Sequence, residues 1–107
     1  MPRGSVARPS YRIYNKTMSI TFDPAKRERT LIERGIDFAD AAHVFAGPTL
    51  TFEDDRHDYG ETRLITIGWL GERMVVMVWT PRGEDRRIIS MRYANARETT
   101  RFAERLG

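Results

Sequence analysis

The stretch from Met74 to Trp79, which reads MVVMVW, constrains the fold more than any other part of the chain. It is apolar on both faces, which is typical of a central strand covered on both sides. Short turns flank it, Leu70-Gly71-Glu72 before it and Pro81-Arg82-Gly83 after it. Turns of this length join antiparallel neighbours. The three strands predicted in this way are residues 62–70, 73–80 and 86–93.

Capping signals predict three helices. Asp23 followed by Pro24 is an N-cap with proline at the first helical position, which predicts a helix over residues 24–34 that ends at Gly35. A sequence resembling a capping box at residues 37–40 opens a second helix that ends at Gly47. Asn95, with Glu98 three residues later, caps the last helix.

The apolar residues of the first two helices indicate which sides are buried. In the first helix we expect Leu31 and Ile32 to be the main apolar anchors. In the second, the spacing i, i+3, i+4 and i+7 predicts a buried face. That face consists of Phe38, Ala41, Ala42 and Phe45.

Two further strands complete the predicted fold, at residues 19–22 and 49–52. The order of elements is then β-α-α-β-β-β-β-α. Connections of hairpin length predict an α+β domain with a mostly antiparallel sheet of four to five strands, two N-terminal helices and one C-terminal helix.

The length of 107 residues allows one domain, which we expect over residues 18–107. Residues 1–17 contain four basic residues and no acid, and we expect them to form a flexible extension. Without those four, the chain carries 14 basic and 15 acidic residues, so the net charge of +3 is weak evidence for nucleic-acid binding. The chain has no cysteine and no apolar run long enough to cross a bilayer, so we expect a soluble, cytoplasmic protein.

The local charge between Thr80 and Arg92 is more informative, because four arginines fall within eleven positions. Strict alternation along the strand would place Arg86 and Arg92 on one face and Arg87 on the other. Together with Arg63 on a neighbouring strand, these arginines fit two interpretations. They either bind phosphate or form ordinary surface ion pairs with nearby acidic residues. The sequence leaves both interpretations open.

An acidic segment lies between the second and third predicted strands. Its oxygen ligands, from Asp54, Asp55, Asp58 and Glu61, do not follow the spacing of a calcium loop, and only two histidines occur in the chain. We therefore expect a solvated loop rather than a metal site. His57 or Glu61 beside arginines also fits a proton-transfer role.

Two other residues are candidates for binding. Lys26 lies in the first turn of its helix, where a cation is unfavourable with the helix dipole. Trp79 has a ring that fits stacking on a nucleic-acid base, although its strand position favours the core.

Several segments together resemble the BrnT family of toxins from bacterial type II toxin–antitoxin modules. They keep their order over about residues 19–103. The matching segments are Phe22-Asp-Pro-x-Lys26, Gly35-Ile-x-Phe38, Ala42-x-Val44-Phe45, Asp58-Tyr-Gly-Glu-x-Arg63, Ile67-Gly68, Val78-x-Thr80-x-Arg82 and Arg87-Ile-Ile-Ser-x-Arg92-x-Ala94, followed by Glu98.

The resemblance implies a RelE-like fold and an RNA endonuclease that needs no metal or other cofactor and inhibits translation. It also implies a BrnA-like ribbon-helix-helix antitoxin that neutralises the toxin in a complex. The rival interpretation is a non-catalytic module whose basic face binds an acidic partner or nucleic acid.

The resemblance carries over to individual residues. At the motif positions we predict catalytic roles for Glu61, Arg63, Arg82 and Arg92, and RNA contacts from Lys26 and Arg87. His57, as an alternative catalytic base, and Trp79, as an RNA-binding ring, join these predictions on the residue-based arguments above and not on the resemblance. The chain departs from the family pattern at Thr30, at Arg34 and at Phe102, where the family often has asparagine, histidine and tyrosine.

Overall fold

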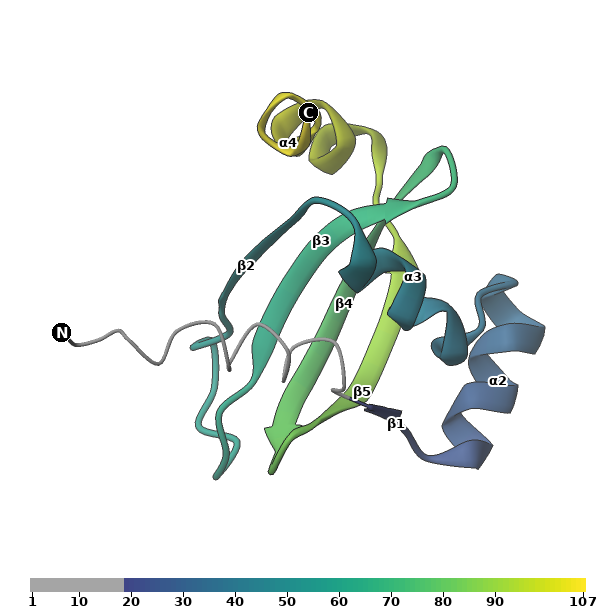
Figure 1. Ribbon diagram of the computed structural model, residues 1–107, viewed down its shortest axis with the longest axis vertical. Coiled ribbons are helices and arrows are strands. Elements are labelled where there is room, and N and C mark those ends of the chain that lie inside the picture. Colours follow the sequence, from purple (N-terminus) through teal and green to yellow (C-terminus); the bar gives the residue numbers. More distant parts are fainter. Residues whose placement is uncertain (1–18) are drawn as a thin grey trace, which may run out of the picture.

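The computed structural model describes residues 19–107, and the extension expected at residues 1–17 lies outside them. The described elements run β1 (Ile20–Thr21), α2 (Pro24–Arg34), η1 (Phe38–Asp40), α3 (Ala41–Ala46), β2 (Thr49–Glu53), β3 (Leu64–Leu70), β4 (Arg73–Arg82), β5 (Asp85–Tyr93) and α4 (Ala96–Leu106). The strands form one sheet in the order β1-β5-β4-β3-β2 (Figure 1). Among the strands described in residues 19–107, β1 and β5 are the one parallel pair. The predicted α+β class is confirmed.

Strand β4 lies at the centre of the sheet and is apolar on both faces, as its sequence predicts. On one side, which we call the α3 face, Val75, Met77 and Trp79 pack with Val44 and Phe38. The opposite side is the α4 face. There Met74 and Val76 join Ile67, Phe102 and Leu106. Figure 1 shows α3 in front of the sheet and α4 across its upper end.

A β-bulge in β5 makes the prediction of strict alternation wrong. Val78 pairs with Ser90, whereas its neighbour Trp79 pairs with Ile88, so β5 contributes one extra residue at this point. The extra residue reverses the order in which side chains alternate. Ile88 and Met91, three residues apart, therefore both enter the core on the α3 face.

Helix α2 begins as predicted but buries none of its residues from Pro24 to Arg34. The Asp23 carboxylate accepts a hydrogen bond from the Ala25 N–H at 3.0 Å and caps the helix. Leu31 and Ile32 are 42% and 76% exposed, so the prediction that they anchor the helix is wrong. Polar contacts hold α2 instead, since Arg34 donates to the Met91 carbonyl at 2.9 Å.

A second contact ties α2 to the segment that follows it. The Arg27 side chain makes two hydrogen bonds of 2.7 Å to the Asp37 carboxylate. Asp37 also caps η1, because it accepts from the Ala39 N–H at 2.9 Å.

The second predicted helix is a 3₁₀ turn, η1, followed by the short helix α3. Its buried residues are Phe38, Ala41 and Val44, at intervals of three. The first interval spans the 3₁₀ turn, which has three residues per turn, and the second lies in α3, where residues three apart also share a face. Ala42 is exposed, contrary to the predicted spacing, and Phe45 is half-buried. Gly68 of β3 lets α3 approach closely, since a Cβ there would lie 2.6 Å from Val44 Cγ1.

Helix α4 carries the predicted capping box. The Asn95 side chain accepts from the Glu98 N–H at 2.8 Å, and the Glu98 carboxylate accepts from the Asn95 N–H at 2.9 Å. Phe102 and Leu106 are buried against the upper end of the sheet. Within residues 19–107, no helix is both long and apolar enough to span a membrane.

Candidate functional site

The strand register places three site arginines on the α4 face. Arg92 pairs with Val76, Arg87 with Thr80, and Asp85 with Arg82, and paired residues of an antiparallel sheet point to the same side. Because of the bulge, Arg87 and Arg92 share this face instead of lying on opposite ones. Arg63, immediately before β3, belongs to it as well, since it alternates with Ile65 and Ile67.

Glu61 lies between two of the arginines at the end of the sheet away from α4. Its carboxylate is 3.2 Å from Arg82 Nη2 and 3.5 Å from Arg63 Nε. Glu61 and Arg63 are about one-third exposed or less, while Arg82 is 55% exposed. One carboxylate facing two guanidinium groups leaves a net positive charge, and we call these three residues the Glu61 cluster.

Tyr59 supports the Arg63 side chain from the other side. The Arg63 Cζ lies 4.0 Å from the centre of the Tyr59 ring, within the range of a cation–π contact. Arg63 Nε is buried and has no hydrogen-bond partner among residues 19–107. Its distance of 3.5 Å from Glu61 Oε2 counts as an ion-pair contact and not as a hydrogen bond. The guanidinium is therefore stacked and held next to an acid without being fully hydrogen-bonded.

Arg87 borders the cluster from the neighbouring strand. It is half-buried and has no ion-pair partner among the described residues. Thr80, its partner on β4, is 2% exposed and donates to the Thr62 carbonyl at 2.6 Å. Arg63 follows Thr62, and strands lie about 4.8 Å apart, so the Cα atoms of Arg63 and Arg87 are separated by roughly 10 Å.

Arg92 is engaged elsewhere on the same face. Both of its terminal nitrogens donate to the Glu98 carboxylate at 2.8 Å, in the bidentate geometry of a strong ion pair. These hydrogen bonds raise the pKa of Arg92, and together with the Asn95 N–H they lower the pKa of Glu98 to about 2. Along β5, Arg92 is roughly 20 Å from the residue opposite Arg82.

The structure thus brings Glu61, Arg63 and Arg82 into contact and leaves Arg92 in a separate pair. His57 is exposed and packs edge-on against Tyr59, with ring centres 5.6 Å apart. Lys26 is half-buried in the first turns of α2, beyond the β1 side of the sheet.

Trp79 does not line the cluster. It is 7% exposed on the α3 face, packs edge-on against Phe45 at 5.5 Å, and donates from Nε1 to Thr66 Oγ1 at 2.7 Å. This position gives the ring a core role and leaves no face exposed for a nucleic-acid base. The core alternative considered for Trp79 is the one that fits.

The acidic segment is organised around one residue. Asp54 is buried, and Arg56 and Tyr59 occupy its carboxylate oxygens. Asp55 and Asp58 are exposed. Over residues 19–107, no three His, Cys, Asp or Glu side chains lie close enough together to share a metal ion.

Two contacts between an arginine and an aromatic ring, one at the site and one on the opposite face of the sheet, were not predicted. Tyr59 lies within the motif Asp58-Tyr-Gly-Glu-x-Arg63, but its contact with Arg63 depends on how the loop folds back. Arg86 lies on the α3 face, 4.0 Å from the centre of the Phe45 ring, and burial lowers its pKa. Alternating arginines gave a signal for Arg86, but the bulge changed the face on which it lies.

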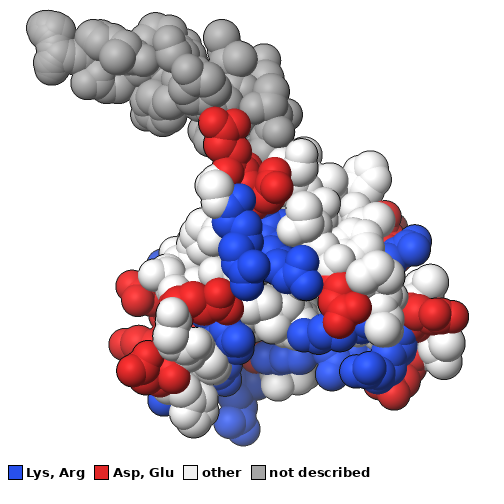
Figure 2. All heavy atoms as spheres, turned by 90° about the horizontal axis from the view of Figure 1, so that it is seen from below, with Lys and Arg blue, Asp and Glu red and all other residues white. Residues whose placement is uncertain are grey.

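Figure 2 looks onto the end of the sheet that carries the β4–β5 turn. Lysine and arginine side chains gather near the middle of this view, and acidic side chains lie on both flanks. Arg63, Arg82 and Arg87 all belong to this end, by their register. The arrangement suits a ligand with spaced negative charges, such as the phosphates of a nucleic acid.

Comparison with known families gives one finding for this chain. The family described as "Ribonuclease toxin, BrnT, of type II toxin-antitoxin system" matches residues 22–98. The matched region includes the Glu61 cluster and extends to the partner of Arg92. Comparison with curated proteins finds no match.

Proposed function

The chain belongs to the BrnT family of type II toxin–antitoxin ribonuclease toxins, and from this premise we propose that the Glu61 cluster is its RNA-cleaving centre. The observation that supports the assignment is one carboxylate within 3.5 Å of two guanidinium groups on an open part of the α4 face. Membership of this family implies a ribonuclease toxin that has a protein antitoxin.

The proposed reaction uses the RNA's own 2′-hydroxyl. Its oxygen attacks the adjacent phosphorus, the bond to the 5′-oxygen breaks, and a 2′,3′-cyclic phosphate remains. Glu61 accepts the 2′-hydroxyl proton, and the departing 5′-oxygen takes a proton from water or His57. All bonds and protons are then accounted for without a metal ion.

Arg63 and Arg82 stabilise the charge that develops on the phosphate oxygens. In the free protein both face Glu61, so an incoming phosphate takes over their contacts and frees the carboxylate to act as a base. Groups fixed on a sheet need little reorganisation, and removing one such donor costs on the order of 100-fold in rate. Arg87 contacts a neighbouring phosphate.

We assign Arg92 to a different task within the same proposal. Its bidentate pair with Glu98 joins β5 to the capping box of α4, so it stabilises the fold next to the site. Lys26 lies on the other side of β1, where it fits contact with a more distant part of the RNA.

We propose cleavage of cytoplasmic RNA, inhibition of translation, and neutralisation by a ribbon-helix-helix antitoxin. Expression of the gene alone should arrest growth, and expression together with the neighbouring antitoxin gene should relieve the arrest. Harmless expression with intact total RNA would support a non-catalytic binding module instead.

The biochemical test is cleavage of a synthetic RNA by the purified chain in the presence of EDTA. We expect products that end in a 2′,3′-cyclic phosphate, and no cleavage of the same strand made with 2′-deoxy sugars. Loss of activity in EDTA, or cleavage of the deoxy strand, would contradict the proposed chemistry.

A further inference from the structure

We infer that Asp54 and Tyr59 are positioning residues that hold the Arg63 guanidinium in place for the phosphate, an inference that rests on the proposed function. Neither residue touches the reacting atoms in this account. Both act through Arg63, from the loop between β2 and β3.

Asp54 anchors the loop. Its side chain is 1% exposed, although it lies outside the regular strands. Its carboxylate accepts from Arg56 Nε at 2.7 Å, from Arg56 Nη2 at 2.8 Å and from the Tyr59 hydroxyl at 3.3 Å. The hydrogen bonds from Arg56 hold the pKa of Asp54 well below its usual range, so the anchor stays ionised at neutral pH.

Tyr59 connects this anchor to Arg63. Its hydroxyl is bound to Asp54, and its ring lies 4.0 Å from the Arg63 Cζ. The backbone adds a second connection, because the Asp54 N–H donates to the Arg63 carbonyl at 2.8 Å. The start and the end of the loop are therefore fixed to each other at both main chain and side chain.

The ring matters most when RNA is bound. Arg63 Nε has no hydrogen-bond partner among the described residues, so only the ring and the charge of Glu61 orient the guanidinium. A phosphate that displaces Glu61 from Arg63 removes the contact with the Glu61 charge. Tyr59 is then the remaining support, and a support that is already in place lowers the barrier by avoiding reorganisation.

The test is a double-mutant cycle between Tyr59→Leu and Arg63→Ala, measured as single-turnover cleavage of a synthetic RNA. We expect Tyr59→Leu to slow cleavage about 10-fold, with RNA affinity changed less than twofold. In the Arg63→Ala background, Tyr59→Leu should have no further effect. Equal costs in both backgrounds would overturn the inference, because Tyr59 would then act independently of Arg63.

Matched variants separate positioning from folding. Tyr59→Phe keeps the ring and should lose less than threefold, whereas Asp54→Asn weakens the anchor and should slow cleavage like Tyr59→Leu. Asp55→Asn makes the same chemical change at the exposed neighbour and should cleave like the parent protein. If Tyr59→Leu fails to fold, an Asp54→Asn variant as fast as Asp55→Asn would overturn the inference instead.

A measurement without RNA distinguishes failure of this inference from failure of the proposed function. The Tyr59 ring should shift the NMR resonance of the Arg63 Nε proton, and the shift should disappear in Tyr59→Leu. It should weaken in Asp54→Asn and persist in Asp55→Asn. An unchanged resonance in Tyr59→Leu contradicts the positioning, whereas an inactive parent protein with the expected shifts contradicts only the nuclease.

Discussion

The α4 face carries arginine–glutamate contacts at its two ends, and the two ends differ in how their charges are matched. At the α4 end, Arg92 and Glu98 form one bidentate pair at 2.8 Å. At the other end, Glu61 faces both Arg63 and Arg82 at 3.2–3.5 Å, and Arg87 borders them without an acidic partner among the described residues. The Arg92–Glu98 pair has one positive and one negative charge, whereas the Glu61 cluster has two positive charges and one negative charge.

Under the proposed function, this difference separates a structural ion pair from a binding site. Glu98 also accepts the Asn95 N–H, so its contacts hold the start of α4, a task that needs no ligand. Glu61 caps none of the described helices, and the positive charge around it suits the phosphate that we propose as its ligand. Two residues of the same type on one face can therefore serve stability and function respectively.

The largest effect should come from the carboxylate shared by two arginines. We expect Glu61→Gln to slow RNA cleavage by 100-fold or more, because the proposed base is lost. RNA affinity should rise, because a negative charge is removed from the phosphate site. Single-turnover rates and filter binding measure the two quantities, and a variant that cleaves normally would assign the base to His57 or another group.

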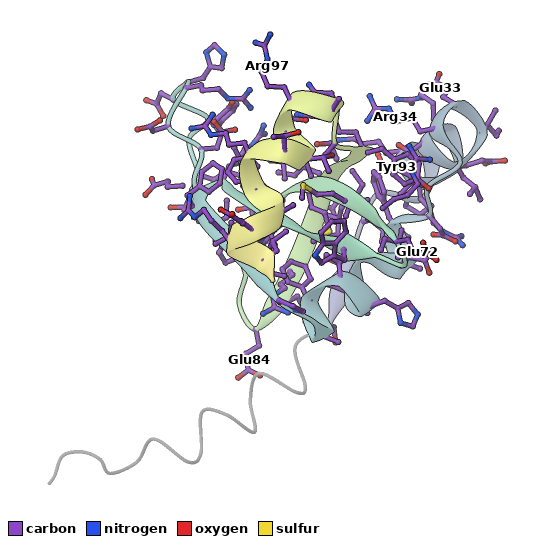
Figure 3. The ribbon with its side chains drawn as sticks, turned by 90° about the horizontal axis from the view of Figure 1, so that it is seen from above. Glu33, Arg34, Glu72, Glu84, Tyr93 and Arg97 are labelled. Carbon is purple, nitrogen blue, oxygen red and sulfur yellow. The ribbon has the colours of Figure 1, made fainter. Side chains whose placement is uncertain are left out.

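The unpaired arginine of the site should give an intermediate effect. We expect Arg87→Ala to weaken RNA binding about equally for all sequences and to reduce the slope of log K against log salt by about 0.7. Titrations at several salt concentrations provide the measurement. Arg97→Ala, an exposed arginine in the first turn of α4 (Figure 3), is the matched control and should leave the slope unchanged.

The balanced pair should affect stability more than cleavage. We expect Arg92→Ala to lower the free energy of unfolding by about 1 kcal/mol, the cost of a partly exposed ion pair and a weakened cap. Chemical denaturation checks this value. An Arg92→Ala protein of parental stability would show that the pair does not hold α4.

The smallest effect concerns pH. Because the folded pKa of Glu98 is lowered from 4.5 to about 2, its contribution to stability is complete above pH 4.5 and is lost as the pH falls towards 2. When the free energy of unfolding is measured across this pH range, it should decline less for Glu98→Gln than for the parent protein. Identical declines would mean that Glu98 does not contribute to the acid sensitivity.

The sequence predicted the sheet better than the site. MVVMVW identified the central strand, and Asn95 with Glu98 identified the last helix, because both signals are local. The bulge at Val78 and Trp79 depends on cross-strand pairing, so alternation assigned Arg86 and Arg92 to one face in error. The exposure of Leu31 and Ile32 was missed because α2 is held by polar contacts to distant segments.

The candidate site residues could be recognised from the sequence by their residue type. Which of them come into contact in the folded protein could not. The motif around Glu61 and Arg63 placed two members of the cluster next to each other in sequence. That Arg82 would join them and Arg92 would pair with Glu98 depends on the strand register. The contact of Tyr59 with Arg63 depends on the folded loop, which no period or cap in the sequence encodes.

The most direct test compares Arg82→Ala with Arg92→Ala in one single-turnover cleavage assay, at a temperature where both variants are folded. We expect about 100-fold slower cleavage for Arg82→Ala, and less than 10-fold slower cleavage for Arg92→Ala. Cleavage slowed more by loss of Arg92 than by loss of Arg82 would contradict the assignment of the site to the Glu61 cluster.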